Sequence, residues 1–187
     1  MPDDAPPTLK STKRMQIFAM NRPYRPTLTR AQKRELRDNL NDWLSRPGYT
    51  HFVTLATNAE AQSPDRMRRL LKHWDARVNK DLIGSRRPKK PDERTMWCAF
   101  GEKFDVNAHW HLLLQTEPDH IKMREDVRLG ESFEDMLRRN WVKLVPSGTS
   151  DVQAICEAEG AIRYVTKAVE RDENWITFIH CFEFRNN

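Results

Sequence analysis

Hydrophobic residues recur along this 187-residue chain with two periods, one typical of helices and one typical of strands. Apolar side chains three and four positions apart predict amphipathic helices, at residues 29–43, 63–79, 132–144 and 157–171. Short runs that are rich in β-branched and aromatic residues, or that alternate polar and apolar, predict strands, at 52–57, 95–102, 109–116, 151–155 and 175–184. This order of elements predicts an α+β domain in which helices pack on one face, the apolar face, of a central antiparallel sheet of about five strands.

Composition divides the chain into two parts. Residues 1–26 are rich in proline and polar side chains, and such a segment buries too little apolar surface to fold alone. We therefore expect a flexible N-terminal arm at 1–26 and a single folded domain at 27–187. Lys and Arg number 32 against 27 Asp and Glu, which gives a net charge of +5. This modest excess permits a nucleic-acid partner without requiring one.

The sequence also bears on the compartment. No apolar run approaches the roughly 18 residues that a membrane span needs, and the acidic, proline-bearing start lacks the apolar core of a signal peptide. We therefore expect a cytoplasmic protein with no membrane partner. The three cysteines, Cys98, Cys156 and Cys181, are odd in number and widely spaced. This pattern indicates neither a disulfide framework nor a zinc site, and we expect three buried thiols in a reducing compartment.

His109-Trp110-His111, followed by three leucines, is the stretch with the most chemical content. Because side chains alternate between the faces of a strand, both imidazoles lie on one face and Trp110 lies on the other. Two neutral imidazoles at this spacing can share one metal ion. The strand before it forms a hairpin with this one, and if Glu102 pairs with His109, the carboxylate joins both histidines on the same face. A register slip of one residue would separate them.

Tyr164 and Lys167 lie in the predicted helix at 157–171. Residues three positions apart occupy the same face of a helix, so the lysine lies one turn after the tyrosine. Taken alone, the tyrosine is typical of an apolar packing residue and the lysine of a solvated charge. Their occurrence downstream of the paired histidines instead indicates a metal-assisted tyrosine nucleophile, with the lysine on the same helix face.

The order of these motifs resembles the HUH endonucleases, specifically the single-tyrosine initiators of rolling-circle replication, or Rep-type nickases. Three segments carry the resemblance, Phe52 to Thr57, His109 to His111, and Tyr164 to Lys167. It implies an RRM-like sheet, with Tyr164 as the nucleophile that forms a covalent 5′-phosphotyrosine. Lys167 would stabilise the phenolate or orient the scissile phosphate.

The same resemblance implies a metal site formed by His109, His111 and Glu102, with Asp105 as the competing third ligand. Nitrogen and oxygen ligands suit Mn²⁺ or Mg²⁺, and Zn²⁺ can also occupy such a site. In the transposase branch of the superfamily, a Gln four residues after the tyrosine commonly completes the metal site. That position is Ala168 here, which favours the replication-initiator branch.

The expected substrate is single-stranded DNA or an origin hairpin, nicked and rejoined to initiate replication of a plasmid or phage. The basic loop residues Arg86, Arg87, Lys89 and Lys90 are candidates for contacts with the DNA backbone, as is the arginine-rich face of the helix at 63–79. Candidates for base stacking are Trp97, Phe104 and His51. No P-loop motif occurs in the sequence, so a helicase and a polymerase would come from the host.

Two other interpretations remain open at this point. One is a single-tyrosine transposase or relaxase of a mobile element, which keeps the chemistry and changes the biology. The other is a catalytically silent DNA-binding module on the same fold. The sequence leaves open the DNA target, the physiological metal, the oligomeric state and whether the chain is a fragment of a longer protein.

Overall fold

Helices and strands form close to the positions that the periodicity predicts. The computed structural model describes residues 28–84, 93–117, 121, 130–171 and 177–185. Its elements are α1 (Arg30–Leu44), β1 (His51–Ala56), α2 (Pro64–Ile83), β2 (Met96–Glu102), β3 (His109–Gln115), α4 (Phe133–Val142), β4 (Thr149–Ala154), α5 (Ala158–Arg171), β5 (Thr177–His180) and the 3₁₀ helix η3 (Cys181–Phe184). The predicted arm at 1–26 and the basic residues Arg86, Arg87, Lys89 and Lys90 lie outside the described residues. Among the described residues, no helix combines the length and the apolar character that a bilayer crossing requires.

The five strands form one antiparallel sheet in the order β4-β1-β3-β2-β5. This arrangement confirms the predicted α+β class and the five-stranded antiparallel sheet. The β2–β3 hairpin pairs Glu102 with His109, so the predicted register is also confirmed. Strand β3 lies at the centre of the sheet, with β1 and β2 as its neighbours.

Side-chain caps explain where the helices begin. Thr29 precedes α1, where its hydroxyl accepts a hydrogen bond from the Gln32 amide, and the Gln32 side chain accepts one from the Thr29 amide. Ser63 accepts a hydrogen bond from the Arg66 amide at the start of α2. Such caps satisfy amides that have no partner inside the helix, which is why Ser and Thr mark these starts in the sequence.

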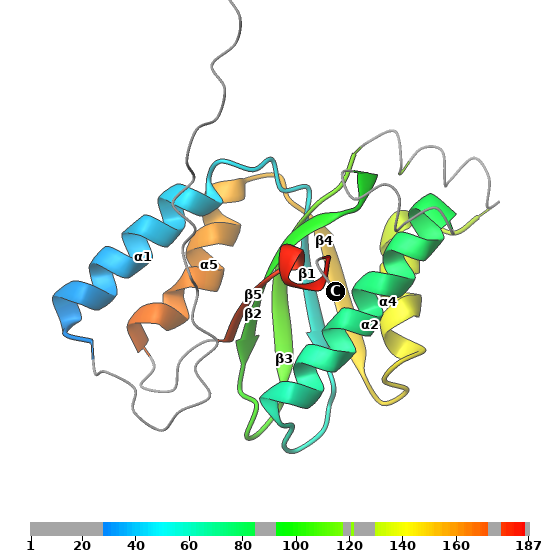
Figure 1. Cartoon of the computed structure of the whole chain (residues 1–187), viewed down its shortest axis with the longest axis horizontal. Helices are drawn as coiled ribbons and strands as arrows, with labels where there is room; N and C mark the ends of the chain where they lie inside the picture. Colours follow the sequence, from blue (N-terminus) through cyan, green and yellow to red (C-terminus); the bar gives the residue numbers. More distant parts are fainter. Residues whose placement is uncertain (1–27, 85–92, 118–120, 122–129, 172–176, 186–187) are drawn as a thin grey trace, which may run out of the picture.

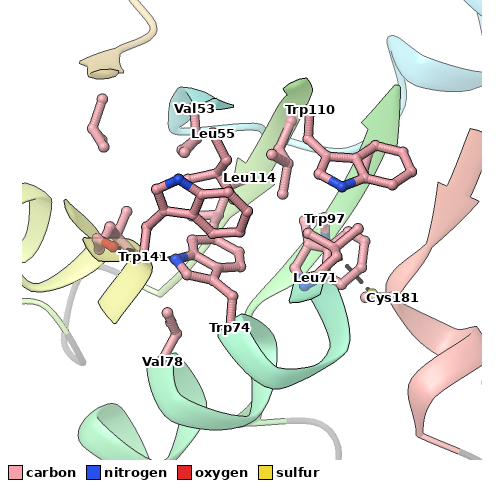
Figure 2. Packing of buried hydrophobic residues seen from close by; sticks show 14 of the residues in the cluster. Val53, Leu55, Leu71, Trp74, Val78, Trp97, Trp110, Leu114, Trp141 and Cys181 are labelled. Atoms are coloured by element: carbon pink, nitrogen blue, oxygen red, sulfur yellow. Dashed lines mark hydrogen bonds between the residues drawn. The ribbon is translucent and has the colours of Figure 1, made fainter. Parts of the chain in front are cut away.

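The larger part of the core lies between the sheet and helices α2 and α4 (Figure 1). Figure 2 shows the indoles of Trp74, Trp97, Trp110 and Trp141 among the aliphatic side chains of this cluster. Three of these indole N–H groups donate to backbone carbonyls of Leu137, Met67 and Ala56, at 3.2, 3.2 and 2.8 Å respectively. Burial of a tryptophan without a partner for its N–H would be costly, so these bonds make the dense aromatic core possible.

Helices α1 and α5 lie on the other side of the sheet (Figure 1). There Leu44 of α1 and Ile162 and Val165 of α5 form a second buried cluster with Phe100 and Leu113 of the sheet. Helices were expected on one face, and the structure shows that they cover both. The reason is the apolar stripe of α5, which must be buried and which the face carrying the histidines accommodates next to α1.

The C-terminal segment differs from the predicted strand at 175–184. Strand β5 ends at His180 and the chain turns into η3. The His180 side chain accepts a hydrogen bond from the Phe182 amide, and the Glu183 carboxylate accepts one from the His180 amide, which caps the turn. The turn brings Cys181 and Phe184 into the core beside Trp97. Local capping and burial therefore overcome the strand propensity of this aromatic run.

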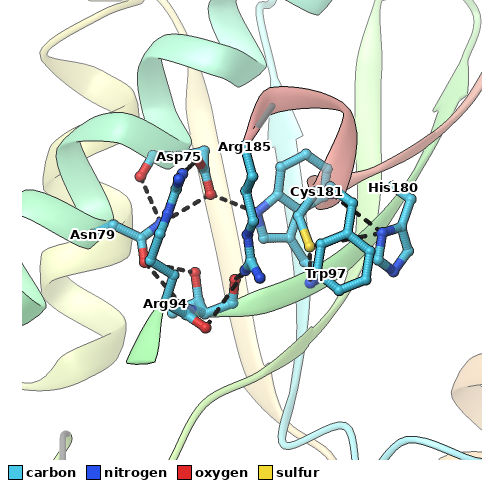
Figure 3. Close-up of polar contacts among 9 residues, drawn as sticks. Asp75, Asn79, Arg94, Trp97, His180, Cys181 and Arg185 are labelled. Carbon is cyan, nitrogen blue, oxygen red and sulfur yellow. Dashed lines mark hydrogen bonds and ion pairs between the residues drawn. The ribbon is translucent and has the colours of Figure 1, made fainter. Parts of the chain in front are cut away.

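A buried polar network fastens this end of the chain to α2 (Figure 3). The Asp75 carboxylate accepts hydrogen bonds from Arg94 at 2.5 Å and from the Trp97 indole at 2.8 Å. Arg185 donates to the backbone carbonyl of Thr95, which follows Arg94 in the chain. The network joins α2, the start of β2 and the residue after η3, and it satisfies a carboxylate that is only 1% exposed.

The cysteines are all free thiols. Cys98 and Cys181 are buried, as expected, and the expectation was wrong for Cys156, which is exposed. Cys156 lies between the end of β4 and the start of α5, outside both buried clusters. The mixed sequence around it gave no periodic signal to separate a loop position from a buried one.

Candidate active site

Three potential metal ligands converge at one end of the sheet. Glu102 is the last residue of β2 and His109 is the first residue of β3, and the two are directly paired. His111 follows two positions later, so its ring lies on the same face. The intervening Trp110 points to the opposite face and is fully buried against α2. The predicted convergence of Glu102, His109 and His111 on one face is confirmed.

The ligand atoms of these residues face one another. The Glu102 Oε2 atom lies 3.7 Å from Nε2 of His109 and 3.9 Å from Nε2 of His111. Because bonds from nitrogen and oxygen ligands to a metal measure about 2.0–2.2 Å, two ligands on one ion lie roughly 3 to 3.6 Å apart. The three ligand atoms all lie within 4.8 Å of one another, so side-chain adjustments on the order of 1 Å close the set around a cation. Asp105, the competing ligand, is exposed in the β2–β3 turn and does not belong to this cluster.

The Nδ1 atoms of both histidines have partners of their own. Nδ1 of His109 lies 2.7 Å from the Asn107 carbonyl, to which it donates, and Nδ1 of His111 lies 3.0 Å from the Thr54 hydroxyl. Such contacts orient the rings and leave Nε2 directed to the shared point beside Glu102.

The protonation states at neutral pH suit metal binding. Burial lowers the pKa of His111 to about 4, in spite of the opposing effect of Glu102, so this imidazole is neutral. A hydrogen bond with His109 holds the pKa of the Glu102 carboxyl below its usual range, although burial opposes it. A cation requires the neutral imidazole and the ionised carboxylate, and both are present.

One carboxylate oxygen of the triad is independent evidence for a cation site. The Oε1 atom of Glu102 is buried and has no hydrogen-bond partner among the described residues. A buried carboxylate oxygen without a partner is costly, and a divalent cation or its bound water removes that cost. The group of Glu102, His109 and His111 can therefore hold a metal ion, and its mixed nitrogen and oxygen donors fit the ions expected from the sequence.

Tyr164 lies beside this triad. Its ring makes an edge-on contact with the ring of His111, with 5.2 Å between centroids, and another with Phe52 at 5.6 Å. The residue is 44% exposed, so a substrate can approach it from solvent. The predicted nucleophile and the predicted ligands thus lie on the same side of the sheet, although they come from different parts of the chain.

Lys167 lies next to Tyr164, one helical turn further along α5. Its Nζ atom lies 3.2 Å from the centroid of the Tyr164 ring, over the ring face. The ammonium therefore contacts the π system of the ring, and its predicted role toward a phenolate or a phosphate stays a prediction. Its positive charge also contributes to the low pKa values of His111 and Glu102.

Helix α5 is held in place by α1. Ile162 and Val165 pack in the second cluster with Leu44 of α1, and the hydroxyl of buried Thr166 donates to Oδ1 of Asn41 at 2.8 Å. Sequence reasoning did not single out Asn41 or Thr54. Both are polar residues in regular elements, and nothing in their local pattern shows which distant residue they meet.

Several of the proposed DNA contacts lie away from the triad. Trp97, Phe104 and His51 belong to the α2 and α4 side of the sheet, where Trp97 is fully buried and Phe104 packs against Trp110. The exposed basic residues of α2 lie on that side as well. Base stacking by these residues therefore stays a prediction, and their packing on this side separates them from the triad.

Comparisons with protein-family models, with curated proteins and with solved structures find no match. Function is therefore inferred from the residues of the site and their geometry. The observations that bear on it are the ligand triad, the tyrosine against His111, and the lysine over the tyrosine ring.

Proposed function

We propose that this protein is a metal-dependent single-stranded DNA endonuclease and ligase that nicks DNA through Tyr164. The observation that carries the proposal is the contact between the rings of Tyr164 and His111, which places a phenol beside a cluster that can hold a cation. A phenol, a metal site and a nearby ammonium are the groups that phosphodiester transfer to an enzyme requires. A metal site with a structural role alone does not account for a half-exposed tyrosine next to it.

The ligands define what the cation contributes. Glu102, His109 and His111 would hold Mn²⁺ or Mg²⁺, and Zn²⁺ also fits this donor set. When bound, a divalent cation polarises the phosphoryl group and offsets the negative charge that develops on its oxygens. The two neutral imidazoles and the single carboxylate leave a net positive charge at the bound site, which favours an anionic substrate.

The reaction follows from the position of Tyr164. The phenol releases its proton to solvent as its oxygen attacks the phosphorus and forms a new P–O bond, while the bond from phosphorus to the 3′ oxygen breaks. The 3′ oxygen leaves and takes up a proton, so the products are a 5′-phosphotyrosine and a free 3′-hydroxyl. Attack of a 3′-hydroxyl on the phosphotyrosine reverses the step and rejoins the strand, because the covalent link retains the bond energy.

Lys167 contributes charge to this step. Its ammonium lies over the Tyr164 ring, so it stands within reach of the phosphate that the tyrosine attacks. A positive charge in this position stabilises the negative charge of the transition state. The flexible stem of lysine allows the ammonium to move from the ring to a phosphate oxygen when the substrate is present.

The surroundings of the site favour a single strand. Helices α1 and α5 stand on this face of the sheet, so a duplex meets an obstacle on that side (Figure 1). The sheet is open towards β4, where exposed Thr149 and Asp151 pair with Ala56 and Thr54 of β1. A single strand can follow this open part of the sheet to the triad.

The biological role within this proposal is the initiation of rolling-circle replication. Ala168 at the position where transposases of this type commonly have Gln supports that branch over a transposase. A host helicase would then unwind the duplex, and a host polymerase would extend the 3′-hydroxyl. Transfer of a strand between two ends of a mobile element, measured with purified protein, would support the transposase instead.

The first prediction concerns the covalent intermediate. Incubation of the protein with a pool of single-stranded oligonucleotides and Mn²⁺ should give a protein–DNA adduct on a denaturing gel. Substitution Tyr164→Phe should abolish the adduct, because the variant lacks the attacking oxygen, and EDTA should abolish it in the parent protein.

Tyr24→Phe is the matched control, since it removes a hydroxyl from another tyrosine that lies outside the three motif segments of the sequence, and it should leave the adduct unchanged. An adduct that persists in the Tyr164→Phe variant would eliminate this nucleophile. Binding of labelled hairpin DNA with no cleavage in Mn²⁺ would instead favour a silent DNA-binding module.

A further inference from the structure

The two histidines of the triad have different kinds of partner at Nδ1. His109 faces the Asn107 carbonyl at 2.7 Å. A carbonyl only accepts hydrogen bonds, so Nδ1 of His109 carries a proton, and Nε2 is the ring atom of His109 that can bind a cation. His111 faces the hydroxyl of Thr54 at 3.0 Å, and a hydroxyl can donate or accept. Which ring nitrogen of His111 carries the proton therefore depends on Thr54 and on the group that binds at the triad.

Thr54 is well placed to control the His111 ring. The two residues are direct partners in the β1–β3 ladder, so their side chains lie on the same face of the sheet. The His111 ring stacks on Phe52, with 5.5 Å between centroids and an angle of 27° between the planes, and the edge of Tyr164 stands against it. These ring contacts restrict its tilt, and the hydrogen bond to Thr54 sets the rotation that directs Nε2.

We propose that Thr54 is a positioning residue for the metal site, whose hydroxyl accepts a hydrogen bond from Nδ1–H of His111 and so holds the Nε2 lone pair towards the cation. The inference rests on the metal site of the proposed function and adds a residue to it. Thr54 does not touch the metal or the substrate, and it acts through His111 alone.

A hydroxyl is the suitable group for this task. Without a cation, His111 can keep its proton on Nε2, which faces the Glu102 carboxylate at 3.9 Å, and Thr54 then donates to Nδ1. A bound cation would occupy the Nε2 lone pair, so the ring proton would stand on Nδ1 and donate a hydrogen bond to the Thr54 hydroxyl. One hydroxyl satisfies both forms, whereas an apolar side chain satisfies neither and leaves Nδ1 of a ring that is 5% exposed without a partner.

The test is the affinity for Mn²⁺ alone, measured by electron paramagnetic resonance of the free ion in titrations of the full chain. Valine matches the shape of threonine and suits a strand, so Thr54→Val should fold. We expect it to weaken Mn²⁺ binding about 10- to 100-fold, the usual effect of removing a group that orients a metal ligand. Thr54→Ser restores the hydroxyl and should bind Mn²⁺ within a few-fold of the parent protein.

Thr95→Val is the control for a general loss of a buried hydroxyl. Thr95 is 2% exposed and its hydroxyl contacts Asn79 on the other side of the sheet. This variant should lose some thermal stability and keep its Mn²⁺ affinity. Thr54→Val should show the reverse, a loss of Mn²⁺ affinity with most of the thermal stability kept.

The outcomes separate the two proposals. If the parent protein binds Mn²⁺ and Thr54→Val binds it equally well, the role of Thr54 is overturned and the metal site stands. Equal weakening in the Thr54→Val and Thr95→Val variants, or no recovery in Thr54→Ser, also overturns the role of Thr54. Absence of Mn²⁺ binding by the parent protein would instead remove the metal site on which the proposed function depends.

Discussion

The identity of the third ligand is a question at the scale of single residues. Glu102 and Asp105 are both acidic and both lie near His109 in the sequence. The hairpin register pairs Glu102 with His109, and the turn leaves Asp105 exposed to solvent. The sequence favoured Glu102 and left Asp105 as an alternative, and strand pairing separates the two.

The distinction leads to a prediction for Mn²⁺ affinity. Glu102→Gln removes the negative charge of the triad and should weaken binding at least about 100-fold, because loss of a group that merely orients a ligand already costs about 10- to 100-fold. Asp105→Asn removes the same charge three residues away and should leave the affinity unchanged. Isothermal titration calorimetry of both variants checks this, and a weaker affinity in the Asp105→Asn variant alone would reverse the assignment.

At the scale of elements, the position of α5 decides whether Tyr164 meets the triad. Periodicity predicted the helix and its apolar stripe, and the structure shows that the stripe packs against α1 and the sheet. The polar bond between Thr166 and Asn41 joins residues 125 positions apart and fixes α5 along α1. The position of Tyr164 beside the triad therefore depends on α1, a helix that contributes no residue to the triad.

Asn41→Ala should slow the formation of the covalent adduct without a change in Mn²⁺ affinity. The substitution removes the acceptor on α1 and leaves the Thr166 hydroxyl to the Ile162 carbonyl of its own helix at 2.9 Å, so α5 loses its polar bond to α1. A displacement of Tyr164 by about 1 Å costs on the order of 100-fold in rate. We expect a reduction of roughly 10- to 100-fold, measured in single-turnover reactions at saturating Mn²⁺.

Asn39→Ala is the matched control, because Asn39 is exposed on the same helix. It should retain the rate of adduct formation. A rate in the Asn41→Ala variant equal to that of this control would mean that the bond between α1 and α5 has no part in alignment.

At the scale of the whole molecule, buried histidines link stability to pH. Burial lowers the pKa of His111 and of His180 to about 4, and it lowers the pKa of His51 as well. Unfolding exposes these rings and returns their pKa values to about 6.5. The unfolded chain thus binds more protons than the folded chain between these values, and the stability that is present above pH 6.5 is lost as the pH falls.

We therefore expect the free energy of unfolding in EDTA to fall between pH 7 and pH 4. The lowered pKa of His111 alone accounts for about 3 kcal/mol at most. Asp75 acts in the opposite direction, since burial raises its pKa, but it is a single group against three histidines. Urea unfolding followed by tryptophan fluorescence at several pH values measures the slope.

His180→Asn should reduce this slope, because asparagine can accept the capping hydrogen bond of His180 without titrating. His73→Asn is the control, since His73 is exposed, and it should leave the slope as it is. Stability that does not change between pH 7 and pH 4 would contradict the assignment of neutral buried histidines.

Local patterns predicted most of the elements and the shared face of the triad. They failed where a contact between distant parts of the chain prevails, as in the turn η3, which forms because Cys181 and Phe184 are buried beside Trp97. They also could not separate the suggested stacking residues from core residues, since aromatic side chains in the core and at a binding surface have the same local signature.

What the sequence determined by itself is the direction of each ligand from its strand. Alternation is a property of the extended backbone, so His109 and His111 share a face in any fold that keeps that strand. Only the tertiary structure decided which groups meet them there. Thr54 lies 57 positions from His111, and Tyr164 comes from a helix whose packing depends on α1. Such contacts follow from the burial of whole surfaces and not from a local period, so the pairing of phenol and metal site is a product of the fold.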